Sequence, residues 1–95
     1  MAEAFNFKQK VNEELIAHVT GKKLKDALRD GTIDPKSKLF LDMGISEERM
    51  RVLARPFNDL IDDFGKSPKR YVSSDDLADC GTLQDLYDLL EPSFS

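Results

Sequence analysis

The sequence has little of the chemistry that enzymes and metal proteins commonly use. Its 95 residues include one His and one Cys, whereas a zinc site takes three or four ligands that are mostly Cys and His. It contains no G-x-S-x-G turn, no P-loop and no Gly-rich dinucleotide turn. Cys80 and His18 are the only candidates for a Cys–His nucleophile pair, and Cys80, beside Gly81, is more typical of a small packing residue. We therefore expect a protein that is not an enzyme and holds no metal.

Long apolar runs and a disulfide are also missing. No apolar run approaches the roughly 20 residues that a membrane-spanning helix needs, and the N-terminal MAEAFNFKQK lacks the layout of a secretion signal. A single Cys cannot form an intramolecular disulfide, which favours a reducing compartment. Hydrophobic residues make up 40% and charged residues 34% of the chain, as in ordinary globular domains. We expect one cytoplasmic, monomeric domain over residues 1–95 that does not bind a membrane.

The charge is negative and unevenly distributed. The net charge of −4 argues against nucleic acid as a partner, because phosphate binding needs clustered Lys and Arg. The formal charge is positive over residues 1–40 and strongly negative over residues 41–95. Such an acidic half favours the basic surface of a partner protein or enzyme. A solvated exterior that keeps the domain soluble is the alternative explanation.

The N-terminal third predicts two helical segments. Apolar residues recur every fourth position at Phe7, Val11, Leu15 and Val19. This spacing predicts a helix of about 15 residues that Gly21 ends, with His18 in its last turn. Residues 22–30 predict a short helix stopped by Gly31, or an extension of the first helix with a kink at Gly21.

The central third predicts a second long helix. Ser46 is a strong N-cap, and Glu47 and Glu48 place negative charge in the positive first turn. An apolar stripe with helical spacing then runs through Met50, Leu53, Ala54, Phe57, Leu60, Ile61 and Phe64. Pro56 interrupts this helix. The continuous stripe favours a kink, and the alternative is a short turn followed by a second helix with Pro56 near its start.

The C-terminal third predicts a short helix and a final amphipathic helix. Ser73 or Ser74 caps the short one, and Thr82 with Asp85 resembles a capping box that opens the final helix. Pro92 is expected to close that helix. The sequence shows no confident strand, no repeat and no low-complexity segment, so the predicted fold class is all-α.

Three short segments carry a family pattern. They are Leu39 with Asp42-Met43-Gly44-Ile45, the IDDFG stretch of residues 61–65, and the DCGTLQDL stretch of residues 79–86. Together they resemble the acyl carrier proteins, including the peptidyl and polyketide carrier domains, over roughly residues 33–90. The resemblance implies a four-helix bundle with a long loop between the first two long helices. It also implies a non-catalytic role in lipid or polyketide biosynthesis.

The resemblance departs from the family at the attachment motif. In that family, the Ser after D-x-G-x-D carries 4′-phosphopantetheine, whose thiol holds the acyl group. Aligned without a gap, Ser46 takes the place of the second Asp and Glu47 takes the place of the attachment serine. With one residue deleted, Ser46 becomes the attachment serine but lacks the preceding Asp. The resemblance therefore implies either a carrier with 4′-phosphopantetheine on Ser46 or a related module without that group.

The same resemblance implies a surface that docks basic partner enzymes. Its expected residues are Asp42, Glu47, Glu48 and Met50, at the start of the second long helix. Every motif above also has a capping or packing explanation. A small all-α adaptor or immunity-type protein unrelated to carriers is therefore the alternative function.

Overall fold

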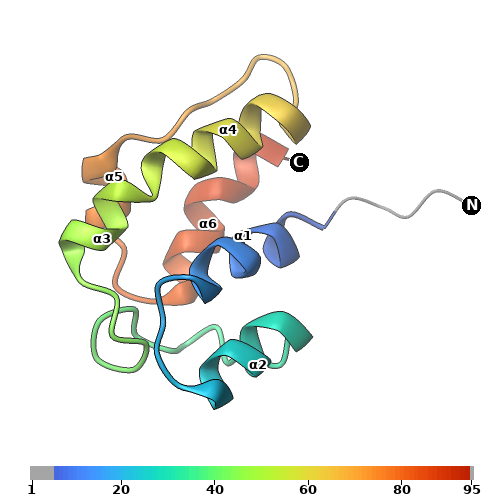
Figure 1. The fold of residues 1–95 in the computed structure, drawn as a ribbon. Coiled ribbons are helices and arrows are strands. Elements are labelled where there is room, and N and C mark those ends of the chain that lie inside the picture. The colour runs from blue at the N-terminus through green and yellow to red at the C-terminus, as the bar shows by residue number, and fades with distance from the viewer. Residues whose placement is uncertain (1–5, 95) are drawn as a thin grey trace, which may run out of the picture.

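The computed structural model describes residues 6–94 and shows an assembly of six helices over that range (Figure 1). They are α1 (Phe7–Ile16), α2 (Lys22–Asp30), α3 (Glu47–Val52), α4 (Ala54–Phe64), α5 (Ser74–Ala78) and α6 (Leu83–Phe94). The described range holds no strand, only an isolated bridge between Lys38 and Thr82. The predicted all-α class is confirmed. No helix within residues 6–94 combines the length and apolarity needed to cross a bilayer.

The core takes side chains from every helix. Helices α1, α4 and α6 pack against one another, α2 lies against α1, and α5 lies against α3 (Figure 1). The buried side chains include Leu15 of α1, Leu28 of α2, Met50 of α3, Phe57 of α4, Leu77 of α5 and Leu86 of α6. No single helix can bury such a face alone, so the helices stabilise one another.

Helix α1 is shorter than the predicted 15 residues. Asn6 caps its start by accepting hydrogen bonds from two backbone N–H groups. The helix ends at Ile16, and His18 lies beyond it. The backbone N–H of His18 donates to the Leu15 carbonyl at 2.9 Å. Val19 is nevertheless buried. The four-residue apolar spacing thus predicted burial correctly but not the end of the helix, because it cannot distinguish a helical turn from a buried loop residue.

Helix α2 is the short helix that the sequence predicted over residues 22–30, so the alternative, an extension of the first helix, is wrong. Gly21, with φ of 94°, precedes this helix rather than ending α1. Gly31 ends it as predicted, with a left-handed φ of 75° and an N–H that donates to the Ala27 carbonyl. Between the end of α2 and the start of α3, the chain runs in turns.

Helices α3 and α4 are separated by one residue, Leu53. It keeps right-handed dihedrals of −70° and −12°, and its N–H donates to the carbonyl of Arg49 at 3.2 Å. Pro56 is the third residue of α4 and has no N–H to donate to the Val52 carbonyl. The chain therefore forms two helices, with Pro56 near the start of the second. This is the alternative that the apolar stripe disfavoured.

Helices α5 and α6 begin at the predicted caps. The Ser73 hydroxyl accepts a hydrogen bond from the Asp76 N–H at 3.1 Å, and Asp76 completes the capping box. The Thr82 hydroxyl accepts from the Asp85 N–H at 3.2 Å, and the Asp85 carboxylate accepts from the Thr82 N–H at 3.1 Å. Both are local side-chain patterns, which explains why the sequence predicts them.

The prediction that Pro92 closes the last helix is wrong, because α6 continues to Phe94. The Phe94 ring is buried and stacks on Phe7 with ring centroids 5.5 Å apart. The Ser93 hydroxyl donates to the Arg70 carbonyl at 2.6 Å. These tertiary contacts hold the last turn in place despite the backbone hydrogen bond lost at Pro92.

Candidate functional site

Residues 35–45 form a loop that is attached to the N-terminal end of α6. The Leu39 N–H donates to the Gly81 carbonyl at 3.0 Å, and the Leu83 N–H donates to the Ser37 carbonyl at the same distance. These bonds connect segments that are more than 40 residues apart in the sequence. They fix the position from which the chain enters α3.

The same loop is closed by its own hydrogen bonds and apolar anchors. The Ile45 N–H donates to the Leu39 carbonyl at 2.8 Å, and the Asp42 carboxylate accepts from the Lys38 N–H at 2.8 Å. Gly44 has φ of 73°, a conformation that glycine adopts readily. The buried side chains of the loop are Leu39, Met43 and Ile45. The Asp42-Met43-Gly44-Ile45 turn is therefore a fixed entry to the helix.

Ser46 is the N-cap of α3, as predicted. Its side chain is half-buried, and its hydroxyl oxygen accepts from the Arg49 N–H at 3.3 Å. Glu47 and Glu48 follow in the first turn and are exposed. The cap uses an oxygen lone pair and leaves the hydroxyl proton free to donate.

A cleft of about 290 Å³ lies beside this cap. Its lining includes Leu39, Ile45 and Glu47 on the α3 side and Cys80 on the side of the α5–α6 turn. Met50 also lines it, but only 2% of Met50 is exposed. Met50 therefore belongs to the core, and its predicted place on an exposed docking surface is wrong.

Cys80 is a half-buried thiol in this cleft. Burial raises its pKa to about 11, with a further contribution from the negative charges of Asp85, Asp79 and Asp76. The thiol donates to the Asp76 carbonyl, with the sulfur 3.6 Å from the oxygen. The His18 Nδ1 atom is buried and has no hydrogen-bond partner in the described part of the chain. No Cys80–His18 pair is formed, and within residues 6–94 no group of three or more His, Cys, Asp or Glu residues is placed to hold a metal ion.

The surface around the α3 N-terminus is mixed in charge. Arg51 lies 3.8 Å from Glu47 and 3.6 Å from Asp75, and these exposed ion pairs contribute little to stability. Arg49 and Arg55 are also exposed on α3 and α4. The acidic character that the sequence suggested for this half of the chain is therefore interrupted here by basic side chains.

Large apolar side chains are exposed in the same region. Phe40 is 65% exposed, Leu41 is 71% exposed, and Val52 on α3 is 67% exposed. Sequence analysis did not single them out. The available signal was the apolar run Leu39 to Leu41, because three consecutive residues in a loop cannot all point into one core. Exposed apolar groups beside charged ones are a common feature of protein interaction sites.

Comparison of the chain with protein-family models, with curated proteins and with solved structures gives no match in any of the three.

Proposed function

We propose that this chain is a small, non-catalytic docking module of acyl-carrier type, built as a four-helix bundle with added elements. In this proposal α1, the pair α3 and α4, the short α5 and the final α6 correspond to the four carrier helices. The observation that carries the proposal is the α3 N-terminus. Ser46 caps that helix directly after a loop held on the α6 N-terminus through Leu39 and Gly81.

The residues around Ser46 do not fit a phosphopantetheine attachment site. Ser46 follows Ile45, which is 1% exposed, instead of the acidic residue that precedes the serine in carriers. Glu47 stands at the first position of α3, and a carboxylate cannot accept the group in a phosphodiester linkage. Ser46 has a sufficient role as the cap. The proposed module therefore acts without 4′-phosphopantetheine.

A mass measurement tests this part of the proposal. The purified chain is incubated with coenzyme A and a broad-specificity phosphopantetheinyl transferase, beside a control carrier that the enzyme modifies. We expect an unchanged intact mass for the wild type. A mass increase equal to one phosphopantetheine group would show a working carrier. Loss of that increase in Ser46→Ala would then assign the attachment to Ser46.

The proposed partner is a protein with a basic and apolar surface. Asp42, Glu47 and Glu48 supply negative charge, and Phe40 and Leu41 supply exposed apolar area next to them. Charges steer the encounter, and apolar side chains contribute when they are desolvated at its centre. The proposed docking surface therefore combines both kinds of group.

Charge reversal tests the docking surface. Partners are captured from a lysate of the native cell, identified by mass spectrometry, and then purified for affinity measurement. We expect Glu47→Lys with Glu48→Lys to weaken binding at least tenfold, and Asp59→Lys with Asp63→Lys on α4 to leave it unchanged. Equal loss in both double variants would remove the argument for this surface, because net charge alone would explain it.

A second candidate function is a small all-α adaptor unrelated to carriers. The observation that favours it is the exposed basic group of Arg49, Arg51 and Arg55, which differs from the acidic docking helix of the carrier family. An adaptor of this kind would bind an acidic partner. In the same binding experiment, Arg49→Glu with Arg55→Glu would then abolish capture, while reversal at Glu47 and Glu48 would not.

A further inference from the structure

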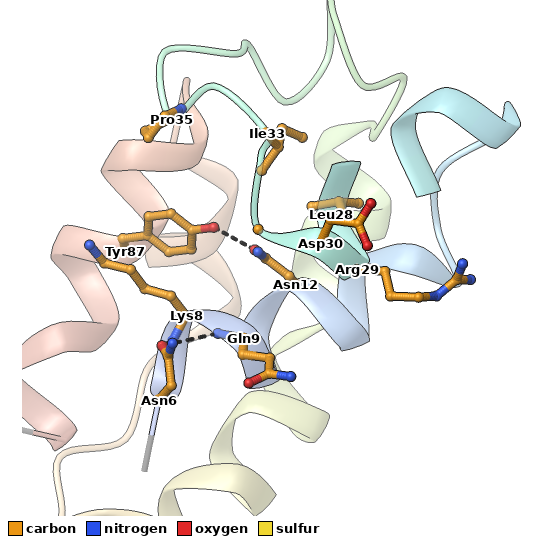
Figure 2. Close-up of a pocket in the computed structure, with 11 residues that line it drawn as sticks. Asn6, Lys8, Gln9, Asn12, Leu28, Arg29, Asp30, Ile33, Pro35 and Tyr87 are labelled. Atoms are coloured by element: carbon orange, nitrogen blue, oxygen red, sulfur yellow. Dashed lines mark hydrogen bonds between the residues drawn. The ribbon is translucent and has the colours of Figure 1, made fainter. Parts of the chain in front are cut away.

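Two clefts of this fold differ in the charge of the residues that line them. The larger, of about 400 Å³, lies between α1, α6 and the loop that follows α2 (Figure 2). A hydrogen bond from the Tyr87 hydroxyl to the Asn12 Oδ1 atom joins α6 to α1 at its wall, as Figure 2 shows. The charged residues that line it are Lys8, Arg29 and Asp30. Because both signs are present, this cleft favours no charged ligand.

The cleft beside Ser46 is lined by charges of one sign. Glu47 and Asp79 are the charged residues that line it, and both are exposed. Asp79 forms no ion pair with a residue from 6 to 94. Glu47 lies 3.8 Å from Arg51, which also lies 3.6 Å from Asp75 and does not line the cleft. One arginine shared by two carboxylates leaves this side of the cleft negative, since exposed ion pairs are weak.

The environment of the Cys80 thiol shows the same sign within the cleft. Cys80 lines the cleft from the turn between α5 and α6. Burial raises the pKa of this thiol, and the negative charges of Asp85, Asp79 and Asp76 raise the pKa further. The neighbouring charges that act on the thiol are therefore carboxylates. A negative potential of this kind favours a cation over an anion as the occupant of the cleft.

Apolar surface lies next to these carboxylates. Three residues that line the cleft, Leu39, Ile45 and Met50, belong to the buried core. Phe40, which is 65% exposed, and the half-buried Ala78 of α5 supply apolar area that a ligand can contact. The cleft lies where α3 and α5 run side by side (Figure 1). Its volume of about 290 Å³ is close to the lower end of the range for small-molecule sites.

We propose that the cleft beside Ser46 binds a small organic cation, which consists of an ammonium group on an apolar body. The ammonium pairs with Asp79 and Glu47, and the apolar body lies against Phe40 and Ala78. The acidic lining disfavours a carboxylate or a phosphate, because like charges placed together are costly. The proposal does not rest on the docking function, because binding of a small amine needs no partner protein.

The test is a titration of the ¹⁵N-labelled full-length chain, followed by NMR. The probe is phenethylammonium, with phenethyl alcohol as the uncharged analogue and methylammonium as the cation without an apolar body. We expect phenethylammonium to shift the backbone amide signals of Leu39, Ala78 and Gly81 saturably, with a dissociation constant on the order of 1 mM for so small a ligand. We expect phenethyl alcohol to bind about fivefold more weakly and methylammonium at least about tenfold more weakly. Added salt should weaken the binding of phenethylammonium and leave that of phenethyl alcohol unchanged.

Two aspartate variants give a matched control, because each removes one negative charge. Asp79→Asn should weaken phenethylammonium binding about threefold, whereas Asp63→Asn on α4 should leave it unchanged, because Asp63 does not line the cleft. Ala78→Leu narrows the cleft and should abolish binding, and if that variant does not fold, the aspartate pair decides. Absent saturation, shifts confined to residues outside the cleft, phenethyl alcohol or methylammonium binding as tightly as phenethylammonium, or equal effects of the two aspartate variants would each overturn the proposal.

Discussion

The side-chain amide of Asn58 forms two hydrogen bonds with the backbone of Val72. Its Nδ2 group donates to the Val72 carbonyl at 2.9 Å, and its Oδ1 atom accepts from the Val72 N–H at 2.8 Å. Val72 is buried and directly precedes Ser73, the N-cap of α5. Asn58 therefore connects α4 to the start of α5, and α5 in turn packs against α3. The loop of residues 65–73 is thus fixed at its end by one side chain.

Replacing Asn58 by Ala should destabilise the fold substantially. Both backbone groups of Val72 lose their partner in a partly buried setting, so we expect the free energy of unfolding to fall by about 2 kcal/mol. Urea unfolding followed by circular dichroism measures this change. Asn58→Asp keeps the acceptor for the Val72 N–H but turns a charged oxygen toward the Val72 carbonyl, so it should be destabilising as well. An Asn58→Ala variant as stable as the wild type would contradict the two-bond account.

Replacing Ser46 by Ala should remove the α3 cap. The Arg49 N–H loses its side-chain acceptor, and we expect a loss of about 1 kcal/mol in the free energy of unfolding. Ser46→Asp retains an acceptor and adds charge that suits the helix N-terminus, so it should keep most of the stability. Thermal or urea unfolding distinguishes the three proteins. If Ser46→Ala were as stable as the wild type, the cap would not explain this serine, and its role as an attachment site would gain weight.

Local patterns in the sequence predicted the starts of α3, α5 and α6, and the structure shows why they sufficed. Ser46, Ser73 and Thr82 each accept from a backbone N–H three residues ahead, which depends on no distant contact. The ends were harder to predict. The last turn of α6 persists beyond Pro92 because Phe94 stacks on Phe7 from the other end of the chain, and a local pattern cannot show such a contact.

The two clefts could not be predicted for the same reason. The Tyr87 hydroxyl meets Asn12 across a separation of 75 residues, and both residues look like ordinary members of amphipathic helices. For Met50, the sequence predicted an exposed surface position that the structure does not show. Its place near the start of α3 suggested a docking role, yet packing against α5 buries it. Charge and apolar patterns predict which residues can be exposed, and tertiary packing decides which are.

Asp85 should make the stability of the fold depend on acid pH. Backbone hydrogen bonds from Gly81 and then Thr82 lower the pKa of its carboxyl in the folded chain. A folded pKa below the unfolded value means that the stabilisation is complete above the unfolded pKa of about 4 and is lost as the pH falls through the folded pKa. We expect the free energy of unfolding, measured in urea from pH 7 to pH 2.5, to decrease at the acid end.

The matched variants for this effect are Asp85→Asn and Asp59→Asn. Asp85→Asn removes the titrating group at the α6 N-terminus, so its acid loss should be shallower than that of the wild type. Asp59 is an exposed carboxylate on α4, and its replacement should leave the acid slope close to that of the wild type. Parallel curves for the wild type and Asp85→Asn would contradict the assignment of the pH dependence to this cap.

Cys80 should react slowly with thiol reagents while the chain is folded. Its pKa of about 11, raised mainly by burial, keeps the thiol protonated at pH 8, whereas a thiol in an unfolded chain has a pKa near 8.5. Because only the thiolate attacks, alkylation by iodoacetamide at pH 8 should be on the order of 100-fold slower in the folded chain than in urea. The pH profile separates this cause from simple shielding. If the raised pKa controls the rate, the folded chain should gain about tenfold per pH unit from pH 8 to pH 10, while the unfolded chain levels off above about pH 9. If shielding alone slowed the reaction, both profiles would level off at the same pH and differ only in height.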